Sequence, residues 1–374
     1  MTAQPTVLKE GTAPSVLFVD PFSTKGCHLF DDDFFLTECI KPLTQEYLAA
    51  TPPESAANLR RRLQVNTWDI PPVDPKARSD RPRLFRLVLS LSAVPFQDII
   101  FQSFEEVSVL LFMLRNPFKR VHLIVTNNLR PDRLKRNPVL GRFFLRAVFQ
   151  RAASVIVHSQ HEVEKVREIT PRINPDRIFI KPFHQISASR LRIPLDQKRR
   201  MVLFLGPESP HKRVAPIVDL IKMDHGRQYQ YLFFAMNGNT AAETEAFLQS
   251  RENVELRFGY IPADEYYRLF SEAALILMTH DKDYEGTLSG AFCDAIASGT
   301  PVVAQDMAPH NEFFAAFGPM GFLVDYADPD WFEPLLATDL SARYQEFQKN
   351  MIACRDSCNM EAIRNVFRSA LMLS

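Results

Sequence analysis

The sequence predicts an α/β protein made of two doubly wound, Rossmann-like domains, and three observations lead to this fold class. Short β-branched runs alternate with helical segments along the chain, which is typical of parallel sheets. The alternation stops in a polar and basic stretch, Ile186–Arg200, and starts again at Met201. The 374 residues also exceed what one ordinary core accommodates. We therefore expect two domains joined by a linker near residues 186–200.

The first domain is predicted to span residues 1–190. Its first strand, Ser15–Phe22, is a buried β-branched run that ends in Asp-Pro, and the apolar run Asp98–Gln102 precedes a helical segment. Further buried strands are expected at Val121–Asn127, Ser154–Ser159 and Asp176–Pro182. The strand–helix alternation predicts a parallel sheet with helices on its faces.

The second domain is predicted to span residues 200–340, followed by a helical tail over 341–374 that packs back toward the first domain. Its expected strands are the runs MVLFLG, YQYLFFAM, VELRFGYI, ALILMTH, TPVVAQ and GFLVD. In doubly wound sheets the ligand lies at the carboxyl ends of the strands. We therefore expect the two domains to face each other across a cleft that contains the ligand.

The composition narrows the classes of function. Lys+Arg and Asp+Glu both number 44, so no global positive field favours nucleic acid as a partner. The five cysteines are scattered and are expected to be buried free thiols, as in a reducing cytosol. The N-terminal segment lacks an apolar signal sequence, and no apolar run is long enough to cross a membrane. We expect a cytoplasmic protein.

A candidate anion site begins where the first strand of the second domain ends. Gly206 permits a sharp exit from this strand, and Lys212 and Arg213 lie where the following loop enters a helix. A helix N-terminus carries a partial positive charge, so this arrangement suits a phosphate. Taken alone, the basic pair is better explained as a solvated helix start.

A second stretch, Asp283–Asp306, supplies further groups for the same anion. Thr287, Leu288, Ser289 and Gly290 lead into a short apolar helix whose first backbone N–H groups have no intrahelical acceptor. Carboxylates stand on both sides of this loop at Glu285 and Asp294. Neither a P-loop sequence nor GxGxxG is present, which favours the diphosphate of a nucleotide-sugar over ATP or NAD.

The order of these motifs resembles the C-terminal half of retaining glycosyltransferases with the GT-B fold, in particular glycosyltransferase family 4 (GT4, glycosyl transferases group 1). The resemblance rests on VLFLGPESPHKR, NVELRFGYIPADEYYRLFSEAALILMTH, EGTLSGAFCDAIASGTPVVAQD and GFLVDYADPD. In the N-terminal half it continues more faintly through SVIVHSQHEVEKV and DRIFIKPFHQI. The resemblance implies transfer of a sugar from a nucleotide-diphosphate donor with retention of configuration, without a cofactor or a bound metal.

The resemblance also implies roles for single residues. Lys212 would bind the donor diphosphate, with Gly206, Arg213 and the loop residues Thr287–Gly290 beside it. Glu285 would act on the transferred sugar, and Glu285 and Lys212 would be the catalytic pair. Asp294 would hold the nucleotide ribose, and Tyr260 with Ile261 would border the base. On the acceptor side, Asn127 stands where the family often has a histidine. His158 ends a strand near the expected cleft, and a structural role is an equal alternative for it.

The chain departs from the family pattern at several positions. Pro207 replaces the usual arginine after the glycine, and Asn127 stands where a histidine is common. Glu285 and Asp294 are nine positions apart, one more than usual, and the second carboxylate is an aspartate. These departures leave open a catalytically silent binding subunit, or a sugar phosphorylase or epimerase on the same fold.

The segment Arg130–Arg151 interleaves basic and aromatic residues and contains a single acid, Asp132. One interpretation is a helix that packs its aromatic residues inward and exposes its basic ones to water. The other is a peripheral contact with anionic lipid at the inner membrane face, which would bring the site to a lipid-linked acceptor. The resemblance, taken with this segment, implies a glycosyltransferase acting on a glycan, glycolipid or related acceptor in bacterial polysaccharide or glycoconjugate synthesis.

Overall fold

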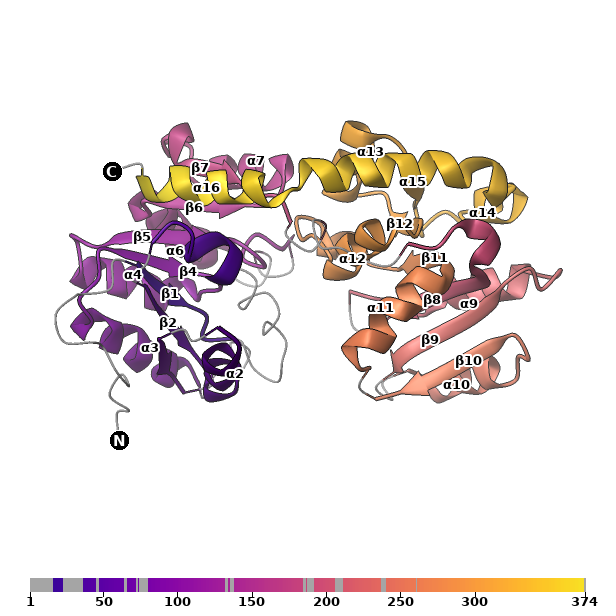
Figure 1. The fold of residues 1–374 in the computed structure, drawn as a ribbon, viewed down its shortest axis with the longest axis horizontal. Helices are drawn as coiled ribbons and strands as arrows, with labels where there is room; N and C mark the ends of the chain where they lie inside the picture. Colours follow the sequence, from indigo (N-terminus) through magenta and orange to yellow (C-terminus); the bar gives the residue numbers. More distant parts are fainter. Residues whose placement is uncertain are drawn as a thin grey trace. The chain divides into compact units, whose positions relative to one another are not determined.

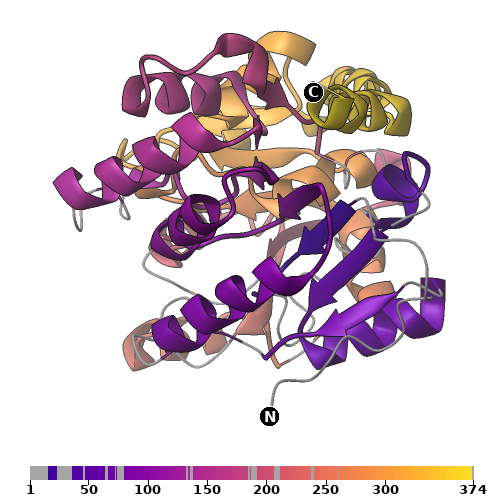
Figure 2. The same ribbon diagram turned by 90° about the vertical axis from the view of Figure 1, so that its left-hand side faces the viewer.

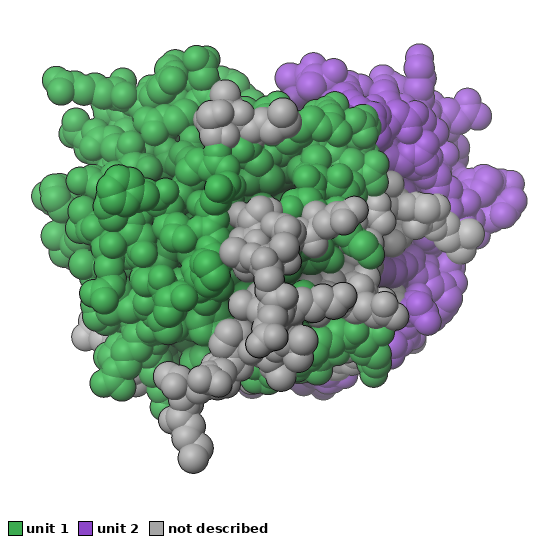
Figure 3. All heavy atoms as spheres, turned by 60° about the vertical axis from the view of Figure 1, so that its left-hand side comes forward, with its two compact units in different colours: residues 1–129, 133–182, 360–374 green, residues 130–132, 183–359 purple. Residues whose placement is uncertain are grey.

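A computed structural model of the chain, drawn in Figure 1, provides its fold. The residues that it describes are 16–22, 36–44, 47–63, 66–71, 73, 80–131, 134, 138–183, 186, 192–205, 211–236, 240–259 and 261–372. The chain divides into two compact units, coloured separately in Figure 3. Unit 1 comprises Met1–Leu129, Arg133–Pro182 and Met360–Ser374, and unit 2 comprises Arg130–Asp132 and Phe183–Asn359.

Unit 1 contains a seven-stranded parallel sheet in the order β3-β2-β1-β4-β5-β6-β7. Its strands are β1 (Val16–Val19), β2 (Tyr47–Thr51), β3 (Thr67–Asp69), β4 (Asp98–Phe101), β5 (Arg120–Ile124), β6 (Ser154–Val157) and β7 (Ile178–Ile180). Its helices are α2 (Pro53–Leu63), α3 (Arg81–Ser90), α4 (Glu106–Arg115), α6 (Pro138–Arg151), α7 (Gln160–Ile169), α16 (Met360–Met372) and the π-helical turn η1 (Leu36–Ile40).

Both faces of this sheet are buried, because successive residues of a strand point to opposite sides. In β1, Leu17 and Val19 belong to the core beneath α3, α4, α6 and α7, whereas Val16 and Phe18 belong to the core beneath η1, α2 and α16. The helices α3, α4 and α6 lie side by side along the first of these faces (Figure 2). The first unit is thus a three-layer α/β domain.

Unit 2 contains a six-stranded parallel sheet in the order β10-β9-β8-β11-β12-β13. Its strands are β8 (Arg199–Leu205), β9 (Gln230–Met236), β10 (Val254–Phe258), β11 (Ala273–Met278), β12 (Val302–Gln305) and β13 (Gly321–Val324). Its helices are α9 (Ala215–Met223), α10 (Ala242–Gln249), α11 (Ala263–Glu272), α12 (Gly290–Ser298), α13 (His310–Phe317), α14 (Glu333–Ala337) and α15 (Leu340–Ser357). Along β8, Leu203 and Leu205 pack with α11, α12 and α15, while Val202 and Phe204 pack with α9.

The prediction of two doubly wound α/β domains is confirmed by these sheets. Two strands were missed, β2 and β3, which form one edge of the first sheet. The residues of the expected helical tail form two helices: α15 packs in unit 2, and α16 packs in unit 1 against β1 and η1. Ile186, in the expected linker, is fully buried in a core of unit 2.

Two smaller expectations are also answered. Four cysteines are buried free thiols as predicted, namely Cys39, Cys293, Cys354 and Cys358, and Cys27 lies outside the described residues. Among the helices that the structure describes, none is both long enough and apolar enough to cross a membrane.

Candidate functional site

The sheet of unit 2 has its topological switch point between β8 and β11. From β8 the chain proceeds through β9 to β10 in one direction, and it then returns to β11 and continues through β12 to β13 in the other. In doubly wound sheets, ligands bind outside the carboxyl ends of the strands at this point. The residues that follow β8 and β11 are therefore the first candidates for a site.

These two segments are joined by their backbones. Lys212 forms an antiparallel bridge with His280. The N–H group of Arg213 donates to the carbonyl of Thr279 at 3.2 Å, and the N–H group of Asp281 donates to the carbonyl of His211 at 3.1 Å. This pairing places Lys212, from the loop after β8, next to His280, from the end of β11.

Lys212 is a half-buried cation without a carboxylate partner among the described residues. Its ammonium group lies 4.8 Å from the centroid of the Phe204 ring, at the end of β8. Burial lowers the pKa of the Lys212 ammonium to about 8, because the charged form loses water. An anion beside this group would restore part of the lost stabilisation.

His280 is the second cationic candidate, and the sequence did not single it out. Its side chain is buried and stacks on the Tyr284 ring with centroids 4.3 Å apart. Its Nδ1 has no hydrogen-bond partner within the described part of the chain. Burial lowers the pKa of His280 well below its ordinary value, and Lys212 with other nearby cations lowers it further. The imidazole is therefore neutral at pH 7 and retains an unused polar atom.

Arg213 differs from Lys212 because it is already paired. Its guanidinium lies 3.3 Å from the Asp281 carboxylate and remains largely exposed. The same carboxylate lies 3.6 Å from His211 and accepts the N–H group of Asp283 at 3.0 Å, at the start of the short helix η6 (Lys282–Tyr284). Asp281 thus holds the two loops together and pairs with Arg213 rather than with Lys212.

The loop after η6 brings the N-terminus of α12 into the same unit. Thr287, Leu288 and Ser289 are buried, and Gly290 is the first residue of the helix. The Ser289 side chain makes no capping hydrogen bond, and the hydroxyl of Thr287 has no partner among the residues described. An uncapped helix N-terminus with an unpaired buried hydroxyl is suited to bind an anion.

His310 contacts both α12 and the end of β12. Its ring stacks on Phe292 of α12 with centroids 4.7 Å apart, and its Nδ1 lies 3.1 Å from the carbonyl of Gln305 at the end of β12. Burial lowers the pKa of His310 to about 4. A neutral, buried imidazole therefore positions the helix relative to the carboxyl end of the sheet.

The two predicted carboxylates occupy different surroundings. Glu285 is half-buried directly after η6, and its N–H group donates to the carbonyl of Lys282 at 3.2 Å. Asp294 is buried in α12, where its Oδ2 accepts a hydrogen bond from the Tyr266 hydroxyl at 3.0 Å. The structure therefore assigns Asp294 a partner on α11 that the sequence did not predict.

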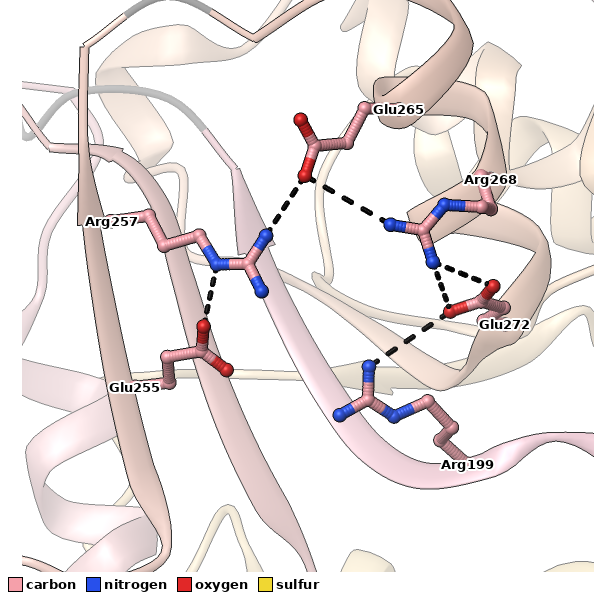
Figure 4. Close-up of polar contacts among 6 residues, drawn as sticks. All are labelled: Arg199, Glu255, Arg257, Glu265, Arg268 and Glu272. Carbon is pink, nitrogen blue, oxygen red and sulfur yellow. Dashed lines mark hydrogen bonds and ion pairs between the residues drawn. The ribbon is translucent and has the colours of Figure 1, made fainter.

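The helix that carries Tyr266 is held by a chain of alternating charges, drawn in Figure 4. Arg257 of β10 contacts Glu255 at 2.5 Å and Glu265 of α11 at 2.9 Å. Arg268 lies 3.9 Å from Glu265 and 2.8 Å from Glu272, which in turn lies 3.9 Å from Arg199 of β8. These contacts connect α11 to two strands of the sheet and thus restrain the hydroxyl that meets Asp294.

The remaining predicted residues are more dispersed. Gly206 and Tyr260 lie outside the described residues, and Ile261 packs half-buried against the core of unit 2. Asn127 is exposed in unit 1. His158, also in unit 1, is buried directly after β6, and its backbone N–H donates to the Glu162 carboxylate.

Unit 1 has a switch point of its own, between β1 and β4, and its polar residues were also missed. Asp20 follows β1 and is fully buried. Its Oδ1 accepts hydrogen bonds from the hydroxyl of Ser103, after β4, and from the N–H group of Phe22, the latter at 3.1 Å. In the sequence, the signal for this residue is the Asp-Pro pair that ends the first strand.

Within the described residues, no group of three or more His, Cys, Asp or Glu side chains is arranged to hold a metal ion. The expectation of a reaction without a metal or cofactor stays a prediction.

Two doubly wound parallel α/β domains are the architecture of the GT-B class, which is also that of the similar solved structures. No protein-family model matches the chain, and no curated protein matches it by sequence. Solved structures do match over nearly the whole chain.

One is HepE of Anabaena in complex with UDP-glucose, which is 14% identical with a TM-score of 0.66 over 95% of this chain and 98% of HepE. A second is sucrose-phosphate synthase of Thermosynechococcus elongatus, which is 17% identical with a TM-score of 0.70 over 97% of this chain and 100% of the enzyme. A third is a candidate UDP-N-acetylglucosamine 2-epimerase of Listeria monocytogenes, which is 14% identical with a TM-score of 0.66 over 95% of this chain and 94% of that protein. The predicted GT-B fold is confirmed, and similarity at this level of identity establishes the fold alone.

Proposed function

We propose that the protein is a retaining glycosyltransferase of the GT4 type, which takes its sugar from a nucleotide-diphosphate donor. The observation that carries this proposal is the pairing of Lys212 with His280 at the switch point of unit 2. Among the described residues, Lys212 has no carboxylate partner and the Nδ1 of His280 has no hydrogen-bond partner. The uncapped start of α12 belongs to the same unit. A UDP-sugar is the first donor to test, because HepE is similar in fold and its structure contains UDP-glucose.

The proposed chemistry is stabilisation of the departing diphosphate. The Lys212 ammonium supplies a positive charge, the first N–H groups of α12 supply donors, and His280 supplies a neutral N–H or an acceptor according to its tautomer. Fixed donors aimed at developing negative charge are commonly the largest contribution to catalysis in a water-poor site. In this proposal the protein's own groups stabilise the negative charge of the departing diphosphate, and no metal or cofactor is expected to do so.

The two carboxylates receive different roles in the proposal. Glu285 precedes α12 and would orient the transferred sugar by accepting hydrogen bonds from its hydroxyl groups. Asp294 would accept the ribose hydroxyl groups, and it would have to share or exchange its present hydrogen bond from Tyr266. Tyr260 and Ile261 remain the proposed border of the base.

The acceptor side is proposed for unit 1, with Asn127 and His158 as the residues to test. We propose a glycan, glycolipid or related acceptor of bacterial polysaccharide or glycoconjugate synthesis, used in the cytoplasm or at the inner membrane face. A lipid-linked acceptor fits the membrane contact proposed for Arg130–Arg151, of which Arg133, Lys135 and Arg136 lie outside the described residues.

The test compares turnover with binding in Glu285→Gln. Orientation of the sugar is felt at the transition state more than in the ground state, so kcat should fall by about a hundredfold, or about 2.7 kcal/mol. Donor affinity, measured by calorimetry, should change little. Glu333→Gln, an exposed residue at the start of α14, is the matched control and should match the wild type in both measurements. An equal loss of turnover in both variants would contradict the assigned role.

One observation favours a second candidate. The fold is shared with a candidate UDP-N-acetylglucosamine 2-epimerase, so interconversion of a free nucleotide-sugar is the alternative reaction. Loss of the donor without any acceptor, with no free UDP formed, would support epimerisation, and a requirement for free phosphate would indicate a phosphorylase. Donor binding without turnover under all of these conditions would support a silent binding subunit.

A further inference from the structure

The outer surface of α3, α4 and α6 concentrates exposed apolar side chains. Eleven large hydrophobic residues are exposed in the described part of the chain, and seven of them lie on these three helices or on the turn after α4. The seven are Phe85, Leu111, Leu114, Phe118, Val139, Leu140 and Phe143. Phe118 and Val139 are 97% and 83% exposed, so neither is part of the core. Exposed apolar side chains gathered on one layer of helices normally mark an interaction site.

The three helices form one surface. All of them pack on the same face of the first sheet, and α4 contacts both α3 and α6 (Figure 2). Their inward residues, such as Leu84, Phe112 and Val148, are buried in a single core. The exposed residues therefore belong to the opposite, outward side of one helical layer.

The charge of this layer is strongly one-sided. The helices α3, α4 and α6 contain seven arginines and one acidic residue, Glu106. The whole chain, in contrast, has a formal net charge of zero. Glu106 is itself engaged, because its carboxylate accepts a hydrogen bond from Asn128 at 2.7 Å. Two of the arginines pair with carboxylates beside the layer, Arg83 with Asp80 at 3.2 Å and Arg142 with Glu168 of α7 at 3.3 Å. The other five arginines still outnumber the acid, so the layer carries a local positive charge.

The arginines are interleaved with the apolar side chains. Arg86 follows the exposed Phe85, Arg115 follows the exposed Leu114, and Arg142 precedes the exposed Phe143. The cores of protein–protein interfaces are instead depleted in charged residues. Alternation of large apolar and basic side chains is characteristic of helices that lie in the interface of an anionic bilayer, where arginine stems follow the apolar surface to the phosphates.

We infer that the outer surface of α3, α4 and α6 docks this protein onto an anionic phospholipid bilayer, with Phe118, Val139, Leu140 and Phe143 entering the acyl boundary and the arginines contacting lipid phosphates. This inference extends the contact predicted for Arg130–Arg151, because it adds α3, α4 and an apolar component. It is independent of the donor chemistry of unit 2.

The experiment is co-sedimentation of the full chain with vesicles of phosphatidylcholine alone and with vesicles of equal parts phosphatidylcholine and phosphatidylglycerol. Binding should be restricted to the anionic vesicles and should weaken with salt. Arg86→Ser and Arg146→Ser should each reduce the partition coefficient about fivefold, the effect of one surface-near basic residue. Phe143→Ser and Phe118→Ser should each reduce it about tenfold or more, because a phenylalanine side chain leaves the apolar phase.

Matched controls come from exposed residues outside this layer. Phe258→Ser, at the end of β10, and Arg172→Ser, after α7, should bind the anionic vesicles as the wild type does. Nucleotide affinity should be unchanged in all of these variants, so failure of the docking surface is distinguishable from failure of the donor site.

Three results would overturn the inference. Equal binding to neutral and anionic vesicles would show that the arginines do not determine binding through lipid charge. If Phe143→Ser and Phe118→Ser bind anionic vesicles as tightly as the wild type, these phenylalanines do not enter the bilayer. A concentration-dependent dimer that these two variants abolish, without vesicle binding by the wild type, would assign the surface to a second copy of the chain.

Discussion

Lys212 and His280 determine the electrostatics of the candidate site. The two basic residues are neighbours, Lys212 half-buried and His280 buried. Burial disfavours the charged form of both groups, and the nearby Lys212 disfavours the charged form of His280 further. A half-buried ammonium group without a carboxylate partner in the described part of the chain is costly to maintain in a structure that has no use for it. It therefore marks a site for an anionic ligand, and the site carries a testable pH dependence.

The pH dependence should appear in the affinity for UDP. The pKa of Lys212 is about 8 without ligand, so the free protein loses this proton as the pH rises above that value. A bound diphosphate requires the proton and raises the pKa, so affinity should fall by up to about tenfold per pH unit above about pH 8. The UDP phosphate titrates near pH 6, and His280 is already neutral, so neither contributes in this range.

Lys212→Arg is the control for this measurement, because a guanidinium stays charged throughout the range. Its UDP affinity, measured by calorimetry from neutral to alkaline pH, should remain level where that of the wild type declines. Parallel curves for the two proteins would show that another group controls the binding.

At the scale of elements, α12 is positioned by a buried imidazole. The pKa of His310 is about 4 in the folded protein and about 6.5 in an unfolded chain, so the unfolded state binds more protons between these values. His310 therefore stabilises the fold less as the pH falls through this window. The difference between the two pKa values determines how much of the free energy of unfolding is lost through His310 as the pH falls.

His310→Phe removes the titrating group and retains a ring to stack on Phe292. Between about pH 7 and about pH 5, the free energy of unfolding of the wild type should fall by about 2 kcal/mol more than that of the variant. Trp331 in unit 2 is the reporter, in a Trp68→Phe background, since the chain has 2 tryptophans and Trp68 belongs to unit 1. Equal losses in both proteins would exclude His310 as the source.

Most of the strands could be predicted because they are buried on both faces. The β8 and β11 sequences, RRMVLFL and AALILM, are nearly continuous apolar runs, which is typical of central strands in a parallel sheet. The missed strands have no such run: β2 is YLAAT and β3 is TWD, only 3 residues long. Their strand conformation depends on pairing with β1 and with each other, which local sequence does not encode.

The site was predictable only in part, for a related reason. Lys212 is visible in the sequence because it follows a strand and precedes a helix. His280 is visible only as a histidine at the end of a strand, and its importance arises from backbone pairing with a segment 68 positions earlier. The hydrogen bond from Tyr266 to Asp294 likewise joins two helices that the sequence separates by 28 positions.

At the scale of the whole molecule, the chain combines two doubly wound domains, each with buried polar residues at its own switch point. Unit 1 has Asp20 and Ser103 there, and unit 2 has Lys212 and His280. The cleft expected between the domains stays a prediction. The structure assigns α16, the last helix of the chain, to unit 1, so unit 1 is completed only after unit 2 has been synthesised.

The central claim is that the switch point of unit 2 binds the diphosphate of a nucleotide donor. Calorimetric titration with UDP, alongside GDP and ADP, tests it most directly in the wild type, Lys212→Ala and the control Lys222→Ala, an exposed lysine of α9 paired with Asp219. We expect the wild type and the control to bind alike and Lys212→Ala to bind about ten- to a hundredfold more weakly, since a charge-assisted contact contributes about 1.5–3 kcal/mol. Unchanged binding by Lys212→Ala, or no binding of any of the three nucleotides by the wild type, would contradict the claim.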